Sequence, residues 1–238
     1  MQMKCNPKTS RQTLLIDADD TLWENNIYFE RAIADFISFL NHREFSPTEV
    51  RRVLYEVERE NIPTRGYGVE SFMHALVGTF ERLSLEPLTP GLRETICGFA
   101  HAIAEYPIKL IEGVEVTLQH LQPRHQLILM TKGNLAEQGG KLERSGLRRY
   151  FNAVEIVTEK DASTYSRMVT SYGLDRESSW MVGNSPKSDI NPALAAGLRA
   201  VFIPHPDTWM LEHEPLLRPD EAERLMELSR FSDLREVF

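Results

Sequence analysis

The sequence predicts an α/β fold in which a parallel sheet carries helices on both faces and an all-helical segment follows the first strand. From residue 107 to about residue 204, short apolar runs alternate with helical patterns, as in repeated strand–helix units. A further apolar run lies alone near the N-terminus, at residues 13–17. Between these parts, residues 23–106 show only the apolar spacing of amphipathic helices. We therefore expect a core domain of residues 1–22 and 107–238 and an inserted helical domain of residues 23–106.

The composition is that of a globular protein. The chain has 238 residues, with 42% hydrophobic and 26% charged residues. This length suits one sizeable domain, or a core domain with a smaller inserted one. The formal net charge of −8 argues against a nucleic-acid partner, because there is no basic stripe to neutralise phosphates. No apolar run approaches the ~20 residues of a membrane helix. The N-terminus lacks a secretory signal, and two cysteines form no disulfide framework. We expect a cytoplasmic protein, monomeric or homodimeric, without a membrane partner.

In the N-terminal half, one strand precedes a series of helices. The strand covers residues 13–17, and residues 29–40 then follow helical spacing. Ser46, Pro47 and Glu49 form a capping-box signature that predicts the start of the next helix. Gly and Pro residues at 62–68 and at 88–91 predict breaks, with helices at 72–83 and 92–103.

In the C-terminal half, strands and helices alternate. Helices are predicted at residues 114–121, 134–145, 162–172 and 190–196, the last three each followed by a glycine that suits a helix end. Strands are predicted at residues 126–130, 154–157, 180–182 and 200–203. The tail from residue 205 is polar, and helical periodicity returns at about residue 220.

Distinctive polar residues follow four of the predicted strands. In a parallel sheet the carboxyl ends of the strands lie at one edge, where ligands bind in open α/β sheets. We therefore expect these side chains to lie close together. They are Asp17 and Asp19 after the first strand, Thr131 after the second, Lys160 after the third, and Asn184 and Asp189 after the fourth.

This set of groups suits phosphoryl transfer. Crowded carboxylates such as Asp17 and Asp19 repel each other unless a cation or a shared proton compensates, so they indicate a metal site, an acid/base pair, or both. Transfer of a phosphoryl group needs positive charge and hydrogen-bond donors, and a carboxylate can serve as its nucleophile. Taken alone, an Asp-rich loop after a strand is also common turn and helix-cap chemistry.

The ordered motifs resemble those of the haloacid dehalogenase superfamily. The resemblance rests on the sequence from Asp17 to Thr21, on Thr131, on Lys160, and on the sequence from Gly183 to Asp189. It covers the core from about residue 14 to residue 204. It implies a Rossmann-like core, and the helical insertion resembles the C1-type cap of that superfamily.

The resemblance also implies residue roles and a Mg²⁺ cofactor. Asp17 would be the nucleophile, forming an aspartyl-phosphate. Asp19 would be the general acid/base, and its backbone carbonyl would bind Mg²⁺. Thr131 would bind the phosphoryl group, and Lys160 would balance the charge of Asp17 and the phosphate. The metal site implied by the resemblance comprises Asp17, Asp19, Asn184 and Asp189.

One residue departs from the superfamily pattern, which has Asp at the position of Asn184. Asn keeps an oxygen ligand but loses a negative charge, so Mg²⁺ affinity should fall. We therefore expect that activity is retained but needs a higher Mg²⁺ concentration than with Asp at this position. A weakly active or non-catalytic binding protein on the same fold is the alternative.

The phosphatase branch is favoured over the dehalogenase branch. A phosphate ester leaves as an alkoxide and needs a proton, which Asp19 would supply, whereas a halide needs none. We therefore expect hydrolysis of a small phosphorylated metabolite. A phosphomutase would share every core residue. Further candidate substrate-binding residues are Lys132, beside Thr131, and Arg65, in a Gly-flanked break of the helical insertion, although a loop position more often carries a solvated charge.

Overall fold

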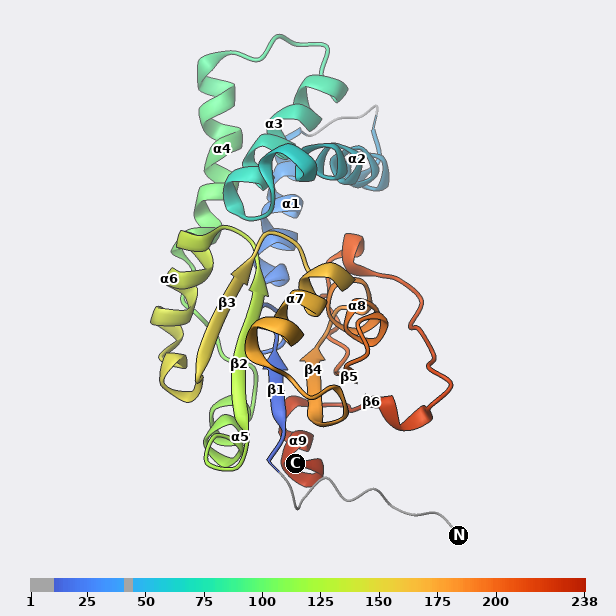
Figure 1. The fold of residues 1–238 in the computed structure, drawn as a ribbon. Helices are drawn as coiled ribbons and strands as arrows, with labels where there is room; N and C mark the ends of the chain where they lie inside the picture. The colour runs from blue at the N-terminus through green and yellow to red at the C-terminus, as the bar shows by residue number, and fades with distance from the viewer. Residues whose placement is uncertain (1–10, 41–44) are drawn as a thin grey trace. The chain divides into compact units, whose positions relative to one another are not determined.

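The computed structural model describes residues 11–40 and 45–238 (Figure 1). Its contacts divide the chain into two compact units. One unit runs through Glu24 and resumes at Ile108–Phe238, and the other is Asn25–Pro107. These boundaries lie within two residues of those expected from the sequence pattern. The strand-bearing unit positions the residues of interest.

Six strands form one sheet in this unit, in the order β3-β2-β1-β4-β5-β6. Every neighbouring pair is parallel, so all strands end at the same edge. The sheet confirms the predicted parallel α/β architecture. The strands are β1 (Thr13–Ile16), β2 (Gln126–Lys132), β3 (Ala153–Val157), β4 (Ser179–Gly183), β5 (Arg199–Phe202) and β6 (Leu225–Glu227).

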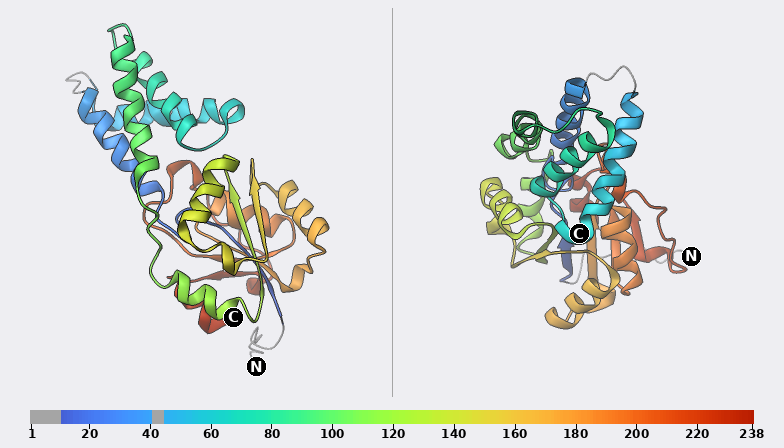
Figure 2. Two further views of the ribbon diagram at one scale, coloured as in Figure 1. Left: turned by 90° about the vertical axis from the view of Figure 1, so that its left-hand side faces the viewer. Right: turned by 90° about the horizontal axis from the view of Figure 1, so that it is seen from above.

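Helices cover both faces of the sheet (Figure 2). In β1, Leu14 and Ile16 pack into one apolar cluster and Leu15 into another, because successive side chains of a strand point to opposite faces. The first cluster includes residues of α5 (Val114–Leu121), α6 (Leu135–Ser145) and α9 (Leu234–Val237). The second includes residues of α7 (Ala162–Tyr172) and α8 (Asn191–Ala195). The central strand is thus fully enclosed, as continuous apolar runs in parallel sheets require.

The second unit is helical and has a core of its own. It contains α1 (Asn26–Leu40), α2 (Pro47–Arg65), α3 (Val69–Leu83) and α4 (Pro90–Glu105). The predicted capping box is present, since the Ser46 side chain accepts from the Glu49 backbone and the Glu49 side chain accepts from the Ser46 backbone. Each helix contributes a fully buried side chain to the core: Phe36, Leu54, Leu76 and Ile96.

Two segments differ from the sequence-based expectation. The helical periodicity near residue 220 is interrupted by strand β6, which pairs with β5, so tertiary pairing outweighs local pattern there. Helix α2 continues through Pro63 to Arg65, although a break was expected from residue 62. It ends at Gly66, whose φ of 69° favours glycine and whose N–H bonds the Ile62 carbonyl.

Two sequence-based expectations concern location. Within residues 11–40 and 45–238, none of the helices is long and apolar enough to cross a membrane. Cys97 is a free thiol, and Cys5 lies outside the described residues.

Candidate active site

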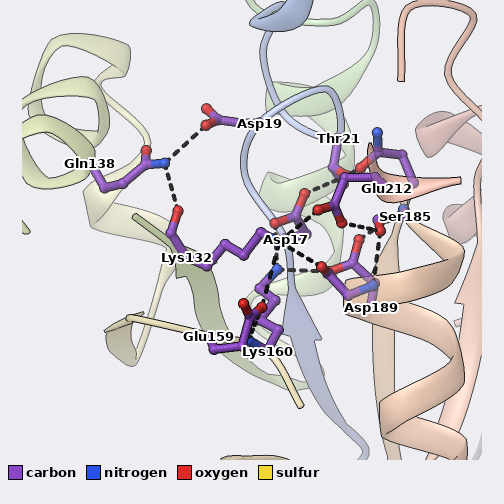
Figure 3. Close-up of polar contacts among 12 residues, drawn as sticks. Asp17, Asp19, Thr21, Lys132, Gln138, Glu159, Lys160, Ser185, Asp189 and Glu212 are labelled. Carbon is purple, nitrogen blue, oxygen red and sulfur yellow. Dashed lines mark hydrogen bonds and ion pairs between the residues drawn. The ribbon is translucent and has the colours of Figure 1, made fainter. Parts of the chain in front are cut away.

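The strand-end edge brings together most of the side chains that the sequence singled out (Figure 3). Asp17 directly follows β1, and its backbone N–H bonds the Val182 carbonyl of β4 at 2.9 Å. Thr131 is the second-last residue of β2 and is 2% exposed. Lys160 lies between β3 and α7. The parallel sheet therefore gathers residues that are far apart in sequence, as the strand-end argument requires.

Asp17, Lys160 and Asp189 form a buried ion-pair network. The Lys160 ammonium lies 2.5 Å from Asp17 Oδ1 and 2.7 Å from Asp189 Oδ1. Asp189 Oδ2 accepts from the Ser185 backbone N–H at 2.9 Å. Asp189 approaches β4 closely because Gly183 has no Cβ, which would lie 2.2 Å from Asp189 Oδ2. The network holds Asp17 in one orientation.

The network carries more negative than positive charge, since two carboxylates share one ammonium. Burial and the neighbouring Asp189 raise the pKa of Asp17 to about 7, although Lys160 opposes the shift. Burial acts to lower the pKa of Lys160, but Asp17 and Asp189 raise it overall, so Lys160 stays charged. A buried carboxylate whose charge is incompletely balanced is the setting in which a bound cation is stabilising.

Asn184 is linked to Asp17 through the Thr21 hydroxyl. The Thr21 hydroxyl lies 3.0 Å from Asp17 Oδ2 and 3.3 Å from Asn184 Oδ1, so it spans the two groups. The Asn184 amide nitrogen donates to Thr208 Oγ1 at 3.0 Å on the other side. The carbonyl oxygen of Asn184, and not its amide nitrogen, therefore contacts the hydroxyl that also contacts Asp17.

Asp19 is turned away from Asp17, toward helix α6 (Figure 3). Its carboxylate accepts from Trp23 Nε1 at 2.7 Å and from Gln138 Nε2 at 2.9 Å. The Lys141 ammonium lies 3.0 and 3.2 Å from its two oxygens. Burial acts to raise the pKa of Asp19, but Lys141 and these hydrogen bonds outweigh it and lower the pKa below its usual value. Asp19 is therefore ionised in this arrangement.

The donors around Asp17 suit a hard divalent cation. Asp17 offers carboxylate oxygens and Asn184 an amide oxygen, since its nitrogen donates to Thr208, and Mg²⁺ prefers oxygen ligands and takes few of them from protein. The excess negative charge at Asp17 and Asp189 points the same way. On these grounds the residues fit Mg²⁺, with the Asp19 backbone carbonyl as a further candidate ligand.

A separate group of possible metal ligands lies beside the site. The ligand atoms of Asp20, Glu24 and His205 lie within 4.8 Å of one another, the one such group of His, Cys, Asp or Glu side chains found among the described residues. His205 Nε2 is 3.2 Å from Glu24 Oε2, an ion pair when the histidine is protonated.

The two further substrate-binding candidates differ in their surroundings. The Lys132 ammonium lies 2.6 Å from Glu212 Oε1 and 2.8 Å from Ser188 Oγ (Figure 3). It is therefore engaged by protein groups in this structure. Arg65 is the last residue of α2, in the helical unit, and is exposed. Substrate binding by Lys132 and Arg65 stays a prediction.

Four contact residues were not foreseen from the sequence: Gln138, Lys141, Thr208 and Glu212. Gln138 and Lys141 lie three residues apart on α6, so both reach the same side of the helix. That spacing is a signal, but an ordinary solvated helix face shows it too. Thr208 and Glu212 belong to the polar tail, and no local pattern connects them to a site more than twenty residues earlier.

Comparison with known proteins agrees with this geometry. The family model of the haloacid dehalogenase-like hydrolases matches residues 12–197. The chain therefore belongs to this family of hydrolases. Its open parallel sheet has the buried network of Asp17, Lys160 and Asp189 at its strand ends.

Two curated relatives are phosphate-ester hydrolases by name. Pyrimidine 5′-nucleotidase YjjG of Escherichia coli is 27% identical over 202 residues, which cover 80% of this chain and 84% of that protein. Phosphoserine phosphatase of Thermus thermophilus is 32% identical over 117 residues, 47% of this chain. The match spans 43% of that phosphatase, less than half of its length.

Solved structures share the whole fold. A haloacid dehalogenase-like hydrolase of Xanthomonas campestris superposes with a TM-score of 0.81 at 30% identity, covering 95% of this chain and 90% of that one. L-2-haloacid dehalogenase of Xanthobacter autotrophicus superposes with a TM-score of 0.62 at 16% identity, covering 95% and 97%. At that lower identity the likeness concerns the fold alone.

Proposed function

We propose that the protein is a Mg²⁺-dependent phosphatase that hydrolyses phosphate monoesters of small metabolites. The observation that carries the proposal is Asp17, a buried carboxylate fixed by Lys160 and Thr21 at the strand ends. Phosphoryl transfer needs a positioned nucleophile beside fixed positive charge. Two relatives with the names of a nucleotidase and a phosphoserine phosphatase support the same class of substrate.

In the proposed first step, an Asp17 carboxylate oxygen attacks phosphorus. The bond to the ester oxygen breaks, and the leaving alkoxide takes a proton from Asp19, which must first leave its ion pair with Lys141 and take up a proton from solvent. Lys160 offsets the negative charge of the phosphoryl oxygens, and Thr131 binds these oxygens by a hydrogen bond. When bound, Mg²⁺ supplies further positive charge there, with Asp17, Asp19, Asn184 and Asp189 as the residues around it.

In the second step, water attacks the phosphorus of the aspartyl-phosphate. Asp19 takes the proton from this water, the acyl-phosphate bond breaks, and Asp17 is regenerated with release of phosphate. In this structure, contacts with Gln138 and Lys141 hold the carboxylate of Asp19 against α6. Catalysis by Asp19 therefore requires its side chain to leave these partners.

Hydrolysis of an aryl phosphate, with Mg²⁺ and with EDTA, tests the proposal. The wild type should release phosphate only with Mg²⁺, and Asp17→Asn should be inactive because an amide is a poor nucleophile. Hydrolysis that survives in Asp17→Asn would exclude Asp17 as the nucleophile. Metal-independent release of halide from a 2-haloacid would instead place the protein with the dehalogenases.

A panel of phosphorylated metabolites would then define the substrate. The named relatives make nucleoside monophosphates and phosphoserine the first compounds to compare. Transfer of the phosphoryl group to another position of the same compound, without phosphate release, would indicate a mutase. The cytoplasmic location remains a proposal, supported by the presence of only two cysteines. The monomeric or homodimeric state is likewise a proposal.

A further inference from the structure

The tail that follows β5 runs along the segment that carries Asn184 and Asp189. We call residues 205–217 the tail segment and residues 184–191 the β4–α8 segment. Side-chain contacts join the two along most of their length. Asn184 Nδ2 donates to Thr208 Oγ1 at 3.0 Å, Lys187 Nζ to the Leu211 carbonyl at 3.0 Å, Asn191 Nδ2 to Glu214 Oε2 at 3.0 Å, and the Leu217 N–H to Asn191 Oδ1 at 2.8 Å.

Glu212 is the buried charge of the tail segment. Glu212 is only 7% exposed, and both of its carboxylate oxygens contact other side chains. Oε2 accepts from the Ser185 hydroxyl at 2.5 Å, and Oε1 is 2.6 Å from the Lys132 ammonium. A buried carboxylate is costly unless it is paired and hydrogen-bonded. Glu212 meets both conditions with groups of the candidate active site.

Through Ser185, Glu212 connects to the Asp17 network. The Ser185 hydroxyl gives its single hydrogen to Glu212, so its lone pairs face the Ser188 N–H, which donates to it at 2.9 Å. That contact caps the π-helical turn Pro186–Ile190, which carries Asp189. The Ser185 backbone N–H also bonds Asp189 Oδ2 at 2.9 Å. Glu212 thus fixes the hydroxyl on which the geometry of this turn depends.

Through Lys132, Glu212 also affects the charge of the site. The Lys132 ammonium contacts Ser188 Oγ at 2.8 Å and lies 3.6 Å from Glu159 Oε1. The Glu159 side chain is 44% exposed, so solvent screens that pair, whereas the Glu212 side chain is 10% exposed. Glu212 therefore neutralises the charge of Lys132 more effectively than Glu159 does. Without this pairing, the positive charge of Lys132 would oppose the binding of a cation nearby.

We propose that Glu212 is a positioning residue that sets the divalent-cation affinity of the active site, by fixing Ser185 and by balancing Lys132. The inference rests on the proposed function, and it assigns a role to the tail, which lies beyond the matched residues 12–197 of the family model. Glu212 hydrogen-bonds Ser185, Lys132 and Ser188, none of which is the proposed nucleophile or a candidate metal ligand, so we expect its effect to pass through these partners.

Glu212→Gln is the primary variant, because it keeps the shape of the side chain and removes its charge. Glu214→Gln is the matched control, since Glu214 also bonds the β4–α8 segment from the tail but is exposed and contacts Asn191. Metal binding is measured without substrate, from the rise in thermal midpoint with Mg²⁺ concentration. Outer-shell partners of metal sites typically contribute 10–100-fold, so we expect half-saturation to need about tenfold more Mg²⁺ in Glu212→Gln.

Two further measurements separate positioning from general stability. Amide hydrogen exchange across residues 184–191 should be faster in Glu212→Gln and unchanged in Glu214→Gln. In Glu212→Gln the Mg²⁺ requirement of hydrolysis should rise more than the KM for the ester. If Glu212→Gln does not fold, Ser185→Ala removes the same hydrogen bond from the other side and should also weaken Mg²⁺ binding.

Unchanged Mg²⁺ half-saturation in a folded Glu212→Gln protein would overturn the proposal. An equal loss in Glu214→Gln would do so too, because it would indicate a general effect of the tail. The proposed function fails separately. If wild type binds Mg²⁺ and Glu212→Gln weakens it, but no ester is hydrolysed, the positioning role stands and the phosphatase activity does not.

Discussion

Asn184 offers a neutral amide oxygen at a site where a negatively charged ligand would bind a cation more tightly. Thr208 holds the amide nitrogen, and the oxygen contacts the Thr21 hydroxyl. The residue can thus serve as a neutral oxygen ligand, and the local negative charge rests on Asp17 and Asp189. Because cation affinity rises with ligand charge, the identity of this single residue should control the Mg²⁺ requirement.

Replacing Asn184 with Asp should therefore lower the Mg²⁺ concentration that gives half-maximal hydrolysis, on the order of tenfold. The measurement is a Mg²⁺ titration of activity at saturating ester. Asn152→Asp is the control, since Asn152 is exposed and its Oδ1 already acts as an acceptor, for the Leu127 N–H. An unchanged Mg²⁺ requirement in Asn184→Asp would show that this oxygen does not contact the cation.

The raised pKa of Asp17 predicts a pH-dependent stability of metal-free protein. Burial and Asp189 raise this pKa from 3.8 to about 7, so the folded chain binds a proton that the unfolded chain releases. The stability contributed by this group is therefore present below about pH 4 and is lost as the pH rises to about 7. Thermal unfolding in EDTA should show this loss, and Mg²⁺ should reverse it at the upper end.

Asp17→Asn provides the comparison, because the amide does not titrate. Its thermal midpoint should fall less steeply than that of wild type between about pH 5 and about pH 7. Parallel pH profiles for the two proteins would mean that other groups dominate.

The site residues differ in how well sequence reveals them. Asp17, Lys160 and Asp189 follow strands, and strand ends can be located from apolar runs, so their meeting in a buried network could be anticipated. The orientation of Asp19 could not, because it depends on which side chains of α6 reach it. Glu212 is hidden for the same reason, since it meets Ser185 and Lys132 only once the tail packs on the β4–α8 segment.

At the scale of single elements, β4 and the turn after it are packed with little tolerance. A Cβ on Gly183 would lie 2.2 Å from Asp189 Oδ2 and 2.7 Å from Asp189 Cβ. Close packing means that an added methyl group displaces the neighbour or strains the strand. The carboxylate that pairs with Lys160 therefore depends on the absence of a side chain at the end of β4.

Gly183→Ala should destabilise the protein by about 1–3 kcal/mol, the usual cost of overpacking, and should sharply reduce hydrolysis. Gly139→Ala is the control within the same unit. A Cβ there meets nothing within 4 Å, and alanine in the helix should add about 0.5–1 kcal/mol of stability. Chemical denaturation of both variants measures the two effects, and an equal change in stability would contradict the packing argument.

The helices and strands were predictable to different extents. The start of α2 was evident, because Ser46 and Glu49 cap it through local hydrogen bonds. The short strand β6 was not, because its three residues become a strand only by pairing with β5. The continuation of α2 through Pro63 could not be predicted from the local sequence either, because proline more often marks a break in a helix.

For the molecule as a whole, an acidic chain is proposed to bind an anionic substrate. The net charge is −8, yet three lysines lie at the strand-end edge. Lys132, Lys141 and Lys160 are each paired with at least one carboxylate: Glu212, Asp19, and Asp17 with Asp189. Binding of a phosphate ester therefore depends on a redistribution of these pairs and on added cations, more than on long-range attraction by the whole surface.

The central place of β1 has a consequence for the order in which the chain folds. Thr13 pairs with Gln126, 113 residues later, and with Ser179 still further along. The helical unit between them has a core of its own built from neighbouring helices, so it can close with much shorter loops. During refolding, pulsed hydrogen exchange should show amides of α2, α3 and α4 protected before those of β1. Simultaneous protection would mean that β1 pairs with β2 and β4 as early as the helical unit closes, and would contradict this order.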